Sequence, residues 1–119
     1  MENCKIEWLT VPAPNLEAAK QFYEHVFGFQ ISKFSERFWV FQSGSLSGGL
    51  DASLSAGEKD VGIGFSITVN SISDALAKIR KYGGSVVGDM YSLGPGNGFC
   101  AQFKDPNGNV LELYSNVSD

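Results

Sequence analysis

The sequence repeats one pattern of apolar residues and turn residues at an offset of 56 positions, the distance from Gly28 to Gly84. The corresponding pairs are Leu9 and Phe65, Val11 and Ile67, Leu16 and Ile72, Ala19 and Ala75, and Gly28 and Gly84. A unit of this length holds one helix and a few short strands. The chain is therefore expected to fold as two similar halves.

Each half carries the start and stop signals of one helix. Asn15 is a suitable N-cap and Gly28 a suitable left-handed C-cap in the first half. In the second half, Ser71 and Asp74 form a capping-box-like pair, and the glycines at 83–84 end the segment. The apolar positions between these signals have helical spacing: Ala19, Phe22, Tyr23 and Val26, then Ile72, Ala75, Leu76, Ile79 and Tyr82.

Short β-rich segments surround both helices. The expected strands are Cys4–Ala13, Gln30–Phe34, Arg37–Gln42 and Gly48–Leu50, then Gly62–Val69, Ser85–Asp89, Phe99–Lys104 and Val110–Tyr114. Residues 1–53 and 60–119 thus form two βαβββ modules of one domain, joined by a linker at 54–59. A sheet covered by one helix must bury its other face elsewhere. We therefore expect an α+β fold whose modules form one curved sheet enclosing a cavity.

Composition limits the partners of the chain. Its net charge of −4 argues against nucleic acid, which needs a basic face. No apolar run approaches the length of a membrane span and no leader is evident, so no membrane partner is expected. Cys4 and Cys100 do not make a disulfide framework. These features predict a reduced, cytoplasmic protein.

Three segments carry a family resemblance: Val11–Glu17, the phrase FYEHVFGF at 22–29, and the phrase DPNGNVLEL at 105–113. With them the chain resembles the vicinal-oxygen-chelate superfamily of glyoxalases, bleomycin-resistance proteins and extradiol dioxygenases over essentially its whole length. The resemblance implies a divalent metal (Zn, Ni, Mn or Fe) held by the first and last strands of the modules. Such a metal polarises substrate oxygens. It also implies a homodimer, because many relatives complete their cavities by dimerisation.

The metal ligands implied by the resemblance are incomplete in this sequence. Trp8 and Gly64 occupy the two first-strand positions, and neither can ligate a metal. Glu112 is the only retained family ligand position, and Asp51 is the carboxylate nearest the end of the first module. The single histidine, His25, falls on a helix. Because one carboxylate is a poor site for a catalytic divalent ion, we expect no metal and no other cofactor.

Glu112 is the candidate catalytic residue. Strand alternation directs Val110, Glu112 and Tyr114 into the cavity, and Leu111 and Leu113 toward the helix. An acid among apolar residues is a candidate base or ligand anchor. Equally, Glu112 is a family residue that only pairs with a polar neighbour, or an acid at the solvent-exposed entrance of the cavity. These interpretations stay open.

Aromatic residues are the other candidates. Trp8 either offers a stacking surface or plugs the cavity as core. Alternation puts Trp39 and Phe41 on the same strand face as Arg37, a possible anion clamp, without deciding which face is inward. The residues between 91 and 98 form either a lid or a plain hairpin connection. The expected ligand-binding residues are Trp8, Trp39, Phe41, Gly64 (as a small residue at a close contact), Phe103 and Tyr114.

Together these features predict a protein that binds or sequesters a small organic molecule without a catalytic metal. The alternative is a glyoxalase-like lyase or isomerase, or a dioxygenase-related enzyme, that uses Glu112.

Overall fold

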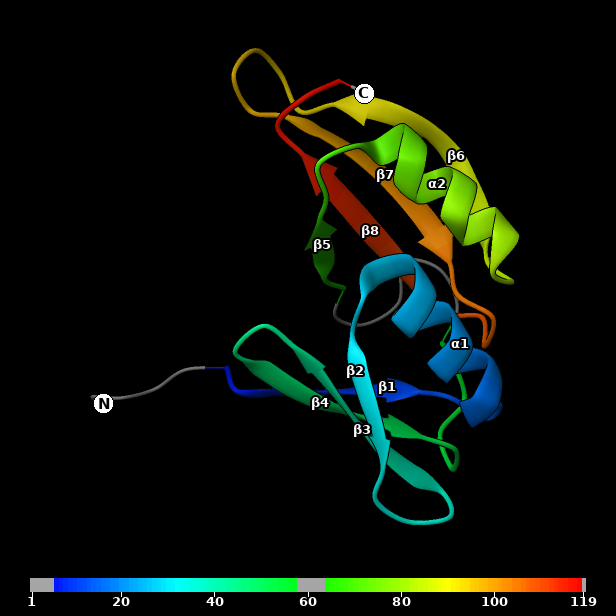
Figure 1. The fold of residues 1–119 in the computed structure, drawn as a ribbon. Helices are drawn as coiled ribbons and strands as arrows, with labels where there is room; N and C mark the ends of the chain where they lie inside the picture. Colours follow the sequence, from blue (N-terminus) through cyan, green and yellow to red (C-terminus); the bar gives the residue numbers. More distant parts are fainter. Residues whose placement is uncertain (1–5, 58–63, 119) are drawn as a thin grey trace, which may run out of the picture.

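The computed structural model describes residues 6–57 and 64–118, and these form two four-stranded sheets and two helices (Figure 1). The elements are β1 (Trp8–Pro12), α1 (Leu16–Phe27), β2 (Gln30–Lys33), β3 (Phe38–Ser43), β4 (Leu46–Asp51), β5 (Ser66–Thr68), α2 (Ile72–Lys81), β6 (Ser85–Ser92), β7 (Phe99–Lys104) and β8 (Val110–Ser115). The strand orders are β1-β4-β3-β2 and β5-β8-β7-β6. In each sheet the first strand pairs in parallel with the last, and the other pairs are antiparallel. The two βαβββ modules are thus confirmed.

Both helices begin and end at the residues that the sequence indicates. The Asn15 side chain accepts the amide of Ala18 at 3.0 Å, and Gly28 follows α1 with φ 72°. The Ser71 hydroxyl accepts the amide of Asp74 at 3.1 Å, which caps α2. These side chains satisfy amides that have no partner inside the helix. Neither helix of the described residues combines the length and hydropathy of a membrane span.

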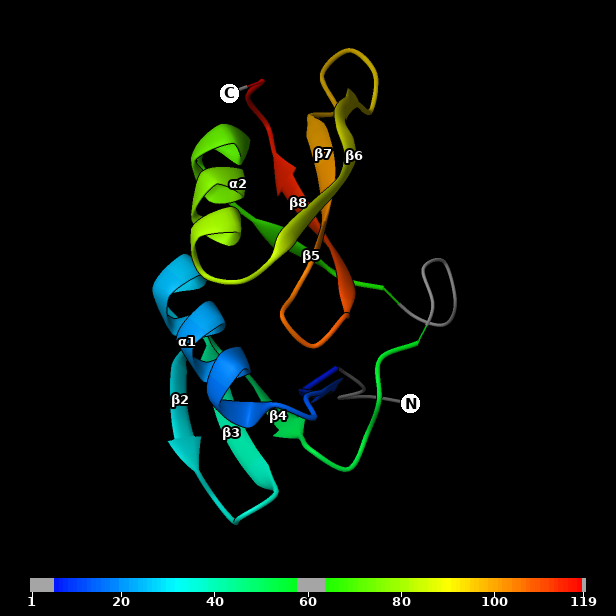
Figure 2. The same ribbon diagram turned by 90° about the vertical axis from the view of Figure 1, so that its right-hand side faces the viewer.

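One apolar core extends through both modules. The two helices lie on the same side of the molecule, one above the other (Figure 2). Phe103 of β7, which is fully buried, packs against α1 of the first module, with ring centroids 6.0 Å from Phe22 and 5.7 Å from Phe27. The modules therefore meet through α1 and the helix-covered side of the second sheet.

The expected single curved sheet is not formed. In the described parts of the chain the two sheets stay separate, and β1 and β5 are both edge strands. The predicted α+β class and its two modules are confirmed, but the sheets are not closed into one, because the modules join through their helices and core rather than through their strand edges. The face of each sheet that points away from its helix, here called the open face, is left uncovered within the described residues.

A buried acid on the β7–β8 turn ties the modules together. Asp105 is 3% exposed, and its side chain accepts the hydroxyl of Tyr23 from α1 at 2.7 Å. It also accepts the backbone amides of Asn107 and Asn109, each at 2.9 Å. Burial raises the pKa of Tyr23 well above its usual range, and the negative charge and hydrogen bond of Asp105 add to the shift.

The same turn also forms hydrogen bonds to the residues just before α1. The Asn107 side chain accepts the amide of Asn15 at 2.7 Å and donates to the Asn15 carbonyl at 3.0 Å. The Asn109 side chain donates to the carbonyl of Pro12 at 2.6 Å. The DPNGN phrase therefore acts structurally: a turn of the second module holds the strand-to-helix corner of the first.

Candidate functional site

Glu112 lies on the open face of the second sheet. Along β8 the residues Leu111, Leu113 and Ser115 are buried, and the residues between them are half-buried. The expected alternation is therefore confirmed for this strand, and Glu112 points away from α2.

Both carboxylate oxygens of Glu112 accept a hydrogen bond. The hydroxyl of Ser66, on the neighbouring β5, donates to Oε1 at 2.5 Å, and the hydroxyl of Tyr91 donates to Oε2 at 3.0 Å. The hydrogen bond to Glu112 is the main reason why the pKa of Tyr91 rises to about 12, and desolvation adds to it. Burial, then the charge of Glu112, raises the pKa of Cys100. The neighbours of Glu112 thus keep their protons and hold the carboxylate in one orientation, with lone pairs left for a further donor.

The register of the sheets identifies the residue that corresponds to Glu112 in the first module. Ser66 pairs with Glu112, and its counterpart 56 positions earlier, Thr10, pairs with Gly49. The Phe38 ring lies over this glycine, because a Cβ at Gly49 would come within 2.2 Å of Phe38 Cζ. At the position where the second module has the carboxylate of Glu112, the first module has Gly49, which has no side chain and is covered by the Phe38 ring.

Trp8 extends this aromatic surface. Its ring is parallel to that of Phe38, with a centroid distance of 6.3 Å and an interplanar angle of 5°. Its Nε1 donates to the Thr10 hydroxyl at 3.0 Å, which fixes the indole. Phe34 meets Phe38 edge-on at 6.5 Å. Trp8 is 46% exposed, so it is not a core plug. We call Trp8, Phe34 and Phe38 the aromatic platform.

The residues present do not fit the divalent metal that the fold implies. Of the two first-strand positions, Trp8 offers an indole and Gly64 no side chain. A Cβ added at Gly64 would meet nothing within 4 Å, so the described residues leave space beside this glycine. Throughout residues 6–57 and 64–118, no three His, Cys, Asp or Glu side chains are grouped to hold a metal ion.

The two other candidate ligands lie elsewhere. Asp51 accepts the amide and hydroxyl of Ser53 at 2.9 and 2.6 Å, and these bonds lower its pKa. The Nδ1 atom of His25 lies 2.7 Å from the Gln21 carbonyl. Asp51 lies on the first sheet and His25 on α1, so neither residue is on the strand or sheet that carries Glu112.

Three aromatic residues expected to bind ligand belong to the helix side of their sheets instead. Trp39, Phe41 and Phe103 are at most 6% exposed. Trp39 and Phe103 are core residues, so we remove them from the open-face site. Phe41 stacks on Phe29 at 5.7 Å. The neighbouring Arg37 donates to the carbonyl of Ala52 at 3.2 Å, which gives it a structural role.

The β6–β7 connection is held closed by its own hydrogen bonds. The Leu93 amide donates to the Gly98 carbonyl at 2.9 Å, and the Asn97 amide donates to the Gly94 carbonyl at 3.1 Å. Tyr114, on the open face, donates its hydroxyl to the Asn97 carbonyl at 3.1 Å. These bonds favour the hairpin interpretation over a lid.

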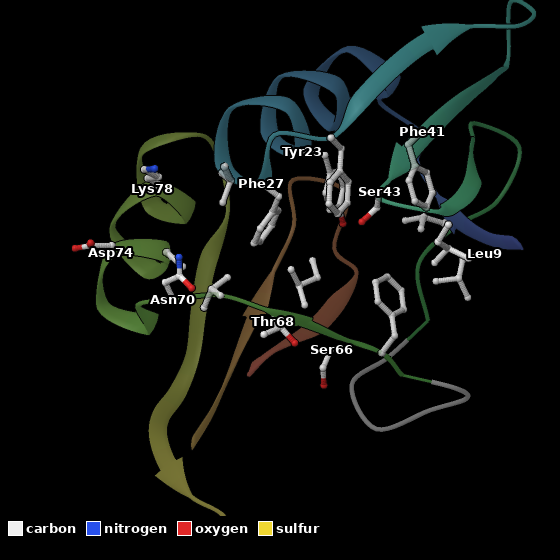
Figure 3. A pocket seen from close by; sticks show the side chains of 18 of the residues that line it. Leu9, Tyr23, Phe27, Phe41, Ser43, Ser66, Thr68, Asn70, Asp74 and Lys78 are labelled. Atoms are coloured by element: carbon white, nitrogen blue, oxygen red, sulfur yellow. The ribbon is translucent and has the colours of Figure 1, made fainter. Parts of the chain in front are cut away.

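A cavity of about 720 Å³ lies between the modules, on the helix side of β1 and β5 (Figure 3). Its walls come from α1, the first sheet, β5 and the first turns of α2. The sequence predicted a cavity lined by the open faces, whereas this one lies on the helix side; of the expected ligand-binding residues, Phe41 belongs to its lining. Its apolar and aromatic lining consists of Leu9, Val11, Tyr23, Val26, Phe27, Phe29, Phe41, Leu46, Leu50, Phe65, Ile67, Val69 and Ala75.

With paired βαβββ modules and an acid on the last strand, the fold and site define a glyoxalase-type protein. The model of the Glyoxalase/Bleomycin resistance protein/Dioxygenase superfamily matches residues 5–113, and the chain belongs to this family. No curated protein matches the sequence significantly.

Solved structures agree on the fold. The chain is similar to a glyoxalase/bleomycin resistance protein/dioxygenase family enzyme from Burkholderia phytofirmans PsJN (TM-score 0.78, 16% identity, 96% of this chain and 100% of the other). It is also similar to the fosfomycin resistance protein FosX from Listeria monocytogenes (0.78, 16%, 99% and 94%). A third similar structure is lactoylglutathione lyase from Agrobacterium tumefaciens (0.68, 21%, 97% and 96%). At these identities the likeness establishes the fold alone.

Proposed function

We propose that the protein binds a small planar organic molecule on its open faces without a catalytic metal. The observation that carries this proposal is the replacement of a carboxylate position by Gly49, covered by Phe38 and flanked by Trp8. Flat aromatic side chains offer broad, rigid contact area to planar ligands. Glu112, held by two donors, supplies a fixed acceptor for an amine or other donor group of the ligand.

The named relatives support a small-molecule role. One is called a fosfomycin resistance protein and another a lactoylglutathione lyase, and both names refer to small organic molecules. A cytoplasmic location is part of the proposal.

We propose further that the protein is a homodimer. The strand edges of β1 and β5 are available, and large apolar side chains are exposed at Trp8, Phe34, Tyr91 and Leu93. In such a dimer the aromatic platform of one copy and Glu112 of the second copy line the same hollow. A chain that stays monomeric in light scattering at micromolar concentration would contradict this part.

Calorimetric titration with proflavine, a planar cation, tests the proposal. Trp8→Ala should weaken binding about thirtyfold, because aromatic stacking and cation–π contacts are each worth about 1 kcal/mol. Glu112→Gln should weaken it by a similar factor through loss of charge. Phe34→Ala, at the platform margin, is the matched control and should have a smaller effect. Unchanged affinity in Trp8→Ala would refute the binding role.

The second candidate is a glyoxalase-like lyase or isomerase, or a dioxygenase-related enzyme, with Glu112 as base. The hydrogen bonds from Ser66 and Tyr91 favour it, because they fix the carboxylate as a catalytic base needs to be fixed. Glu112 can take a proton on a lone pair that neither of these donors occupies. Consumption of lactoylglutathione or fosfomycin that is lost in Glu112→Gln, at unchanged thermal stability, would establish this role. Full activity in Glu112→Gln would exclude it.

A further inference from the structure

We infer that the cavity between the modules is a second binding site, and that it takes an uncharged, largely apolar small molecule. It lies on the helix side of both sheets, whereas the proposed open-face site lies on the other side. The inference therefore goes beyond the proposed function.

The size and lining of the cavity match a small-molecule site. Its volume of about 720 Å³ lies within the range of roughly 300–1,000 Å³ that is typical of ligand pockets. Five aromatic rings line it: Tyr23, Phe27, Phe29, Phe41 and Phe65. Water gains few hydrogen bonds among such walls, so an apolar occupant is favoured over solvent.

Most polar residues of the lining lie on or next to β5 and α2, whereas Ser43 of β3 places its hydroxyl beside Tyr23 and Phe41 (Figure 3). Asp74 and Lys78 of α2 belong to the lining, but their charged ends point away from the aromatic rings (Figure 3). The Tyr23 hydroxyl is already bonded to Asp105. A charged ligand would therefore lose its hydration without gaining a charged partner among the rings, which favours an uncharged one.

The shape of the cavity favours a small molecule over a protein. The large apolar side chains that are exposed in residues 6–57 and 64–118 all lie outside its lining; they are Ile6, Trp8, Phe34, Leu54, Met90, Tyr91, Leu93 and Val117. The aromatic rings that line it are buried or half-buried between the two helices and the two sheets. Protein interfaces use protruding anchors that fill pockets on the partner, and this surface presents none.

Strand β5 separates the two sites and supplies matched variants. Ser66 and Thr68 also border the cavity, but their side chains point away from the rings and toward the open face, where Ser66 bonds Glu112 (Figure 3). Phe65, Ile67 and Val69 line the cavity on the other side. A large side chain at Val69 therefore fills the cavity, and the same side chain at Thr68 fills only the open face.

The test is fluorescence titration with N-phenyl-1-naphthylamine, an uncharged apolar probe. The wild-type chain should take up one probe per chain with saturation. Val69→Trp should weaken this uptake at least tenfold, and Thr68→Trp should leave it within twofold. Val26→Phe, which narrows the cavity from α1, serves as a second filling variant if Val69→Trp does not fold, as judged by circular dichroism.

Two results would overturn the inference. One is saturable uptake that Thr68→Trp abolishes and the filling variants leave unchanged, which places the probe on the open face. The other is no uptake by the wild type, together with a dimer in light scattering that the filling variants dissociate; the cavity is then an interface between two copies.

Discussion

The two modules share one topology but carry different chemistry on their open faces. In the second module, Glu112 accepts hydrogen bonds from Ser66 and Tyr91. In the first, the corresponding Gly49 lies beneath the Phe38 ring. The backbone, caps and strand pairing tolerate either arrangement, because the open face contributes little to the core. The difference shows that this fold can exchange a polar site for an apolar one in one module alone.

The largest expected effect concerns the core rather than the open face. Phe103→Ala should reduce the free energy of unfolding by about 4 kcal/mol, because the ring is fully buried between α1 and its own sheet. Phe34→Ala, whose ring is 79% exposed on the platform, should change it by less than about 0.5 kcal/mol. Urea denaturation measures both. Similar losses in the two variants would mean that the faces are wrongly assigned.

The next effect tests the close contact in the first module. Gly49→Ala should cost about 2 kcal/mol, because the new methyl group would overlap the Phe38 ring. Gly64→Ala is the control: the added methyl meets nothing within 4 Å, so the cost should stay below about 0.5 kcal/mol. Thermal or urea unfolding distinguishes them. If Gly49→Ala is neutral, Phe38 does not lie on this backbone.

A smaller effect is expected from the hydrogen bond that joins the modules. Tyr23→Phe removes a buried donor to Asp105 and should cost about 1.5 kcal/mol. Tyr114→Phe removes a more exposed hydroxyl bond to the Asn97 carbonyl, and about 0.5 kcal/mol is expected. Equal losses would indicate that the turn at 105–109 does not stabilise the module contact.

The smallest effect is a pH dependence. The pKa values of Tyr23 and Tyr91 are raised in the folded chain, that of Tyr91 to about 12, so folding favours the protonated phenols. Their contribution is fully present below the unfolded pKa of about 10 and is lost as the pH rises through the folded values. The melting temperature should therefore fall between about pH 10 and pH 12, and less steeply in Tyr23→Phe than in wild type. Parallel curves for the two proteins would contradict the assignment.

Local signals predicted much of this fold. The caps at Asn15 and Ser71 identified where both helices begin. The alternation along β8 correctly placed Glu112 on the face that points away from α2. The sequence did not decide the inward face of β3, since that depends on pairing with β4 and on the position of α1. Phe103 was misplaced for the same reason: its partner in the register is Leu111, which faces the helix.

The sequence did not identify the counterpart of Glu112, because the offset between the two modules changes along the chain. The offset is 56 at the helices but 63 at the last strands, from Gly49 to Glu112, so the second module has 7 more residues before this point. Most of them lie before β7, where β6 and the β6–β7 connection are longer, and the rest lie in the longer β7–β8 turn. Counting along the sequence thus points away from Gly49. Likewise, the cavity depends on how the modules meet, which the 105–109 turn decides through contacts more than 80 positions apart.

Native mass spectrometry of the untagged protein, alone and with proflavine, tests most directly whether the aromatic platform binds ligand in place of a metal site. If the aromatic platform binds ligand, we expect no stoichiometric divalent ion and one proflavine per chain, with the adduct strongly reduced in Trp8→Ala. One tightly held divalent ion per chain, or an adduct that Trp8→Ala leaves intact, would contradict this expectation.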